Sequence, residues 1–134
     1  MQLDPALVAD TRAWLTKAVM DLRAAELMLA AVPPLLGSAV FHSQQAAEKA
    51  LLAWHDEPFR KTHSLEELGR QALAFDTALA PLVDRAVLLT QYAWKYRYPG
   101  EPEEPSRKEA EVALALAREM YEAVLARLPA EVHP

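Results

Sequence analysis

Apolar residues recur every three or four positions along most of this chain, which is the spacing of one face of an α-helix. In the first such stretch Ala18 and Leu22 share a face, and charged residues such as Asp21 lie between the apolar ones. Stretches that alternate apolar and polar residues are too short to predict a strand. The pattern predicts five helices, over the approximate ranges 6–31, 38–54, 64–73, 77–97 and 106–128.

Residue types that start helices support these boundaries. Asp4 and Pro5 suit a helix start, because aspartate accepts from free backbone N–H groups and proline has no N–H to leave unpaired there. Ser64 and Ser106 each precede a glutamate by three residues, which is the capping-box pattern. Four long helices with short connections, plus one short helix, predict an all-α, up-and-down antiparallel bundle. We expect residues 1–134 to form one domain, since this length suits a single core.

Composition narrows the class of protein. The net charge is -5, so no overall basic field attracts DNA or an anionic membrane, and a nucleotide or RNA would need a local basic site. The absence of cysteine excludes disulfides and thiolate metal sites. No signal peptide is visible and no apolar run approaches the roughly 20 residues that span a bilayer, which predicts a cytoplasmic protein. The 10 prolines and the lack of asparagine favour a thermophilic source.

Several motifs of enzymes and metal proteins are missing. There is no Gly-rich dinucleotide-binding or phosphate-binding loop. No histidine follows a glutamate by three residues, as in di-iron bundles, and there is no His-Glu-x-x-His zinc pattern. We therefore expect neither a metal nor a cofactor.

The second predicted helix carries polar residues where a solvated face would be expected. Ala47 and Leu51 belong to its apolar face, whereas His42, Gln45 and Lys49 fall on the opposite one at spacings of three and four residues. One interpretation is a partly buried polar seam in the core or in a dimer interface. The other is a face that contacts a nucleotide or RNA, and both stay open.

Two further segments combine cations with aromatic or imidazole groups. Lys61 and His63 lie at the start of the third predicted helix, where a helix N-terminus favours phosphate. The alternative interpretation is structural, with Lys61 as a solvated loop charge and His63 packed at the helix entry. The end of the fourth predicted helix, 92–98, contains three tyrosines, of which Tyr98 is the last, and a tryptophan, interleaved with Lys95 and Arg97. Such a segment stacks bases and holds phosphates, but aromatic residues at helical spacing are as often part of a core.

Four segments together resemble the HEPN domain family. They are Trp14 to Ala25, the phrase Phe-His-Ser-Gln-Gln-Ala-Ala-Glu-Lys-Ala-Leu from Phe41 to Leu51, Lys61-Thr-His-Ser-Leu65, and Arg97-Tyr-Pro-Gly100 followed by a helix. The resemblance implies a helical bundle that usually forms a dimer. It also implies pairing with a minimal nucleotidyltransferase in a toxin–antitoxin-like operon. Many other members are metal-independent ribonucleases.

The ribonuclease members carry an arginine followed four to six residues later by a histidine, and this chain departs from that pattern. Arg97 has no histidine in range, and only two residues separate Arg60 from His63. His133 follows Arg127 at a suitable spacing but lies beyond Pro129, in a tail that we expect not to be ordered. The sequence therefore assigns no catalytic residue and leaves enzymatic activity undecided.

Three hypotheses remain from the sequence. The first is a non-catalytic HEPN homodimer that docks a minimal nucleotidyltransferase and binds a nucleotide or RNA. The second is a ribonuclease that uses His42 or His63 with Arg97 and no metal. The third is an oligomerisation module without a ligand. The candidate binding residues are His42, Gln45, Lys49, Lys61, His63, Arg97 and Tyr98.

Overall fold

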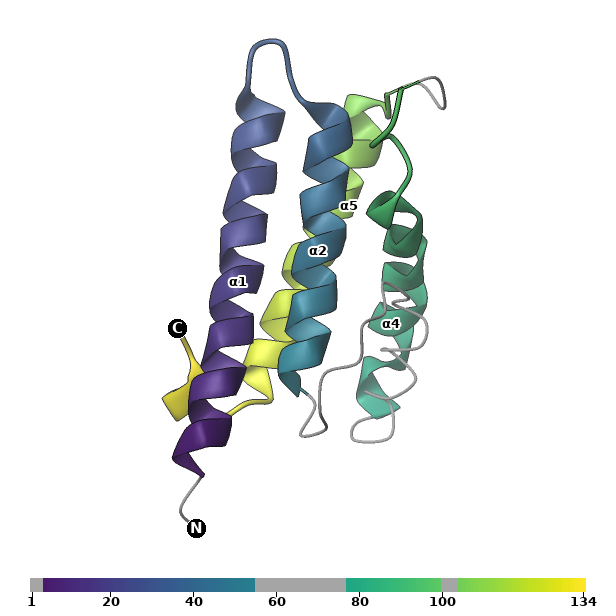
Figure 1. Cartoon of the computed structure of the whole chain (residues 1–134). Coiled ribbons are helices and arrows are strands. Elements are labelled where there is room, and N and C mark those ends of the chain that lie inside the picture. Colours follow the sequence, from purple (N-terminus) through teal and green to yellow (C-terminus); the bar gives the residue numbers. More distant parts are fainter. Residues whose placement is uncertain (1–3, 55–76, 100–103) are drawn as a thin grey trace.

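The first two helices form an antiparallel hairpin, and two further helical segments complete an up-and-down arrangement (Figure 1). The computed structural model describes residues 4–54, 77–99 and 104–134, and these residues contain no strand. The all-α bundle predicted from the sequence is therefore confirmed. The predicted short helix over 64–73 lies outside the described residues. The helices in chain order are α1 (Pro5–Ala30), α2 (Leu36–Trp54), η1 (Thr77–Leu79), α4 (Ala80–Ala86), η2 (Val87–Ala93), α5 (Arg107–Ala126) and η3 (Ala130–Val132).

Two predicted helix starts carry the expected caps. The Asp4 side chain accepts a hydrogen bond from the Ala6 N–H at 3.0 Å, and Pro5 opens α1. The Ser106 hydroxyl accepts from the Glu109 N–H at 3.0 Å at the start of α5. The start of α2 differs from the prediction, because Gly37 lies inside the first turn. Its N–H donates to the Glu104 carboxylate at 2.6 Å. The N–H groups of a first helical turn have no acceptor within the helix, so Glu104 supplies one from outside α2.

The fourth predicted helix is not one continuous α-helix, which corrects the prediction for 77–97. Its α-helical part spans only Ala80–Ala86, and the 3₁₀-helix η2 continues it to Ala93. The physical reason is packing against α2, which acts on a series of buried side chains that recur every three residues. A 3₁₀-helix has three residues per turn and keeps such a series on one side. The series consists of Val83, Ala86, Leu89 and Tyr92.

Helix α2 is the centre of the core, because it packs against α1, α5 and η2. Val40, Ala47 and Leu51 are fully buried, as the sequence pattern predicts. Ala46 and Ala53 on the other side are buried as well, because small side chains let the neighbouring helices approach closely. The polar residues of α2 from His42 to Lys49 are therefore buried or partly buried and do not form a solvated face.

The C-terminal tail is ordered, contrary to expectation. After Pro129 the chain forms η3, and Val132 is buried. The His133 Nε2 atom lies 2.9 Å from the Leu125 carbonyl oxygen and 3.1 Å from the Leu128 carbonyl oxygen. The His133 ring thus adds a side-chain contact to two carbonyls at and just after the end of α5. Among the described residues, no helix is long and apolar enough to cross a membrane.

Candidate functional site

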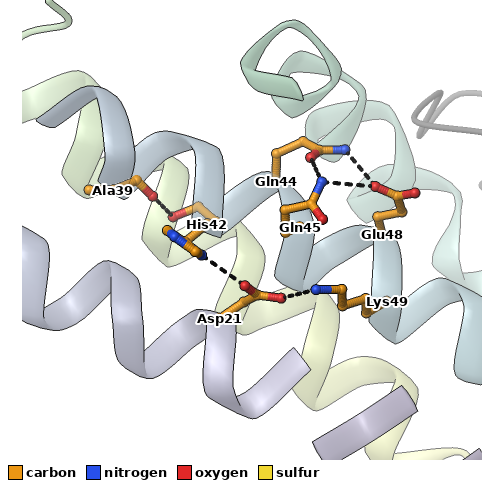
Figure 2. A network of polar contacts seen from close by, with 8 residues as sticks. Asp21, Ala39, His42, Gln44, Gln45, Glu48 and Lys49 are labelled. Atoms are coloured by element: carbon orange, nitrogen blue, oxygen red, sulfur yellow. Dashed lines mark hydrogen bonds and ion pairs between the residues drawn. The ribbon is translucent and has the colours of Figure 1, made fainter. Parts of the chain in front are cut away.

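Two of the predicted binding residues on α2 meet one carboxylate on α1. The His42 Nδ1 atom lies 2.8 Å from one oxygen of Asp21, and the Lys49 Nζ atom lies 2.6 Å from the other (Figure 2). Asp21 is buried, whereas the His42 and Lys49 side chains keep 27% and 24% of their surface exposed. The two α2 residues are seven apart, which is two helical turns, so both reach the same side of α1.

The contact with Asp21 sets the tautomer of His42. A carboxylate only accepts hydrogen bonds, so the Nδ1 atom carries the hydrogen. In the neutral ring the Nε2 atom then carries a lone pair, and it has no hydrogen-bond partner among the residues that the structure describes. The carboxylate also offsets the charge of Lys49. His42 therefore offers one free nitrogen, while the Lys49 ammonium is already paired.

Gln45 makes its hydrogen bonds to neighbours on its own helix. Its amide nitrogen donates to the Gln44 side-chain oxygen at 2.7 Å and lies 3.3 Å from a Glu48 carboxylate oxygen (Figure 2). The Gln44 amide donates to the same Glu48 oxygen at 3.1 Å. Gln44 and Glu48 are both buried. Gln45 thus belongs to a hydrogen-bonded group within α2 that includes the buried Gln44 and Glu48.

Arg97 reaches α2 from the turn that follows η2. Its guanidinium lies 4.4 Å from the centre of the Phe41 ring and donates a 2.8 Å hydrogen bond to the Ala93 carbonyl. The Phe41 ring in turn meets the His42 ring edge-on, with centroids 5.2 Å apart. Arg97, Phe41, His42, Asp21 and Lys49 therefore form one continuous series of contacts, which we call the Arg97–Lys49 row. Three predicted residues (His42, Lys49 and Arg97) are brought together in it.

A small pocket opens beside the Arg97 end of this row. It has a volume of about 190 Å³ and is lined by Gly37, Ser38, Phe41, Tyr96 and Arg97. The pocket thus combines a cation, an aromatic ring and the first turn of α2. The first turn of α2 already holds a carboxylate, because the Gly37 N–H donates to Glu104, so the cationic group that lines the pocket is Arg97.

The aromatic segment at the end of η2 divides between core and surface, which explains why the sequence favoured neither. Tyr92 is buried and its hydroxyl donates to Glu109 at 2.7 Å. Burial, and then the adjacent Glu109 carboxylate, raise the pKa of that hydroxyl. Trp94 and Tyr98 are exposed, and the Arg97 guanidinium lies 5.7 Å from the Tyr98 ring centre.

The role of the buried acidic residues in this region was not predicted from the sequence. Asp21 was predicted to be one of the charged residues between the apolar ones, whereas it lies on the buried side of α1. The available signal was its position three residues after Ala18 and four before Ala25, within the apolar stripe. Two other predicted residues, Lys61 and His63, lie outside the described residues. Across the described ranges, no three His, Asp or Glu side chains are grouped to hold a metal ion.

Comparison with protein-family models decides the family. The HEPN domain model matches residues 11–128, which is most of the chain. The chain belongs to the HEPN domain family. The search of curated proteins and the search of solved structures each gave no match.

The arginine–histidine spacing of ribonuclease members occurs in this HEPN protein only near its C-terminus. Arg127 donates to the Ala123 carbonyl at 2.8 Å, and the His133 ring contacts the carbonyls of Leu125 and Leu128. Both side chains therefore serve the last turns of α5. Their backbone contacts favour a structural role for this pair.

Proposed function

We propose that this HEPN protein is a non-catalytic homodimer that binds a nucleotide or RNA and partners a minimal nucleotidyltransferase in a toxin–antitoxin-like system. The observation that carries the binding part is the position of Arg97, stacked on Phe41 at the edge of a pocket and in series with His42. The partner, the dimer and the operon context are supported by family membership and by the sequence resemblance.

Arg97 has the properties of a phosphate-binding arginine. Its contacts are two aromatic rings and one backbone carbonyl, and no carboxylate pairs with it among the described residues. Its positive charge is thus available, and a guanidinium can hold two phosphate oxygens at once. Stacking on Phe41 limits the conformations of the side chain, which lowers the entropy lost when a ligand is bound.

The exposed aromatic rings suit the remainder of such a ligand. Tyr98 and Trp94 flank Arg97 and present 65% and 57% of their surface to solvent. Bases stack on exposed aromatic side chains without strong sequence preference. The His42 ring, edge-on to Phe41, can make one further hydrogen bond to a base or sugar through Nε2.

Calorimetric titration of the purified protein with ATP, and separately with a short single-stranded RNA, tests the binding proposal. We expect measurable heat with at least one of them at low salt and weaker binding as salt rises, because phosphate contacts are screened. Absence of heat with either ligand at millimolar concentration would rule out the binding part. Co-expression with the neighbouring gene product, followed by affinity purification, tests the nucleotidyltransferase partnership.

A second candidate function, RNA cleavage, is favoured by one observation only. The Asp21–His42 contact through Nδ1 is the kind of arrangement that orients a histidine for proton transfer. Incubation of RNA with the protein in EDTA distinguishes the two candidates. Cleavage by the wild type that is lost in His42→Ala would favour the ribonuclease, whereas intact RNA favours binding without turnover.

The Asp21 contacts also support a purely structural module. If the Arg97–Lys49 row serves only to fix the packing of α1 on α2, then His42→Ala and Lys49→Ala will lower stability and leave ligand affinity unchanged. The binding proposal instead expects His42→Ala to weaken binding.

A further inference from the structure

Tyr96 has a backbone conformation that residues other than glycine rarely adopt. Its φ angle is 68°, in the left-handed region that glycine usually occupies. Such a conformation persists only where the surrounding contacts enforce it, and it recurs at functional sites. Tyr96 directly precedes Arg97 and lines the same pocket.

Contacts with α5 hold the Tyr96 side chain in place. Its hydroxyl lies 3.5 Å from one Glu109 oxygen, and the Tyr92 hydroxyl donates to the other at 2.7 Å. The two tyrosine rings are stacked, with centroids 6.2 Å apart and planes 24° from parallel. The Lys95 ammonium lies 5.0 Å from the Tyr96 ring centre. Glu109 therefore anchors the turn through two tyrosines at once.

Helix α2 holds the other side of the same turn. A side chain at Gly37 would place its Cβ 3.2 Å from the Tyr96 Cβ and 2.8 Å from a Glu104 oxygen. The turn and α2 thus approach each other so closely that a Cβ at Gly37 would require Tyr96 and Glu104 to shift. This close approach brings the residue after Tyr96 onto α2, where the Arg97 guanidinium meets Phe41.

We propose that Tyr96, anchored by Glu109, is a positioning residue that fixes the Arg97 guanidinium over Phe41 at the edge of the pocket. The effect on ligand affinity rests on the proposed function, whereas the placement of Arg97 does not. Tyr96 acts through its own strained backbone conformation, which sets the direction of the chain at Arg97. Arg97 makes the ligand contact.

The placement of Arg97 is measured without a ligand. Protons of the Arg97 side chain close to the face of Phe41 experience the ring current, so their NMR signals lie upfield. Tyr96→Gly removes the ring and allows the turn other conformations, and Glu109→Ala removes the anchor. We expect the upfield shift to be largely lost in both variants and retained in Glu111→Ala, a change at an exposed glutamate on the same helix. An unchanged shift in Tyr96→Gly and Glu109→Ala would overturn the proposal.

The effect on binding is measured by a double-mutant cycle with ATP as the probe. We expect Tyr96→Gly to weaken ATP binding about tenfold when Arg97 is present and to have no effect in the Arg97→Ala background. The reason is that the effects of substitutions at two residues that act together are not additive. Equal losses in both backgrounds would show that Tyr96 does not act through Arg97, and would contradict the proposal. A wild type that binds no ATP, but whose ring-current shift responds as expected, would refute ATP binding and retain the positioning role.

Discussion

Asp21 on α1 and His42 on α2 are joined by a 2.8 Å contact at the interface between the two helices. The same carboxylate holds Lys49 one turn beyond Gln45, so a single acid pairs two basic side chains. Asp21 is nearly buried, and its removal would leave both basic groups without the acid that compensates their burial.

The first prediction concerns this acid. Asp21→Ala should lower the free energy of unfolding by about 2 kcal/mol, since breaking a buried pair costs more than an exposed one. Urea denaturation provides the measurement. Glu119→Ala is the matched control, because the Arg85–Glu119 pair is exposed on both sides and should contribute less than about 1 kcal/mol. Equal costs for the two variants would contradict the assigned role of Asp21.

The second prediction concerns stability at alkaline pH. The pKa of Tyr92 is raised in the folded protein, so the folded state keeps a proton that the unfolded state releases above about pH 10. Its contribution is therefore fully present below about pH 10 and is lost as pH rises further, by up to about 1.4 kcal/mol per pH unit. Tyr92→Phe should reduce this decline in urea titrations above pH 10. The exposed Tyr98→Phe should leave it unchanged, and an unaltered decline in Tyr92→Phe would contradict the account.

The third prediction concerns the C-terminal tail. His133→Ala should lower the free energy of unfolding by about 1 kcal/mol, because the Leu125 and Leu128 carbonyls would lose a hydrogen-bond donor. Thermal or urea unfolding measures the change. Glu131→Ala is the control. Arg12 contacts the backbone carbonyl of residue 131, which this substitution keeps, so the variant should unfold like the wild type. Wild-type stability in His133→Ala would show that the tail does not support α5.

Much of the fold could be predicted because local chemistry determines it. The apolar period identified the long helices, and Asp4 and Ser106 act as the caps that their positions indicated. The 3₁₀ geometry of η2 could not be predicted in the same way. Its buried residues are three apart, and that spacing also occurs on one face of an α-helix. Only packing against α2 selects between the two geometries.

Three of the predicted site residues lie close together in the structure, but the contacts that connect them could not be predicted from the sequence. His42, Lys49 and Arg97 stood out as polar residues in unusual positions, and the structure brings them together. The contact of His42 and Lys49 with Asp21 depends on the register between α1 and α2, which no local pattern encodes. The order of the tail likewise depends on the burial of Val132 and on the contacts of His133.

The most direct test of the account compares ATP affinity in Arg97→Ala and Arg85→Ala by calorimetry. Both variants remove one guanidinium, but Arg85 pairs with Glu119 on an exposed surface away from the pocket residues. We predict at least about a tenfold loss of ATP affinity in Arg97→Ala, as expected for a charge-assisted contact, and little change in Arg85→Ala. Equal affinities in the two variants would contradict the claim that Arg97 holds the ligand.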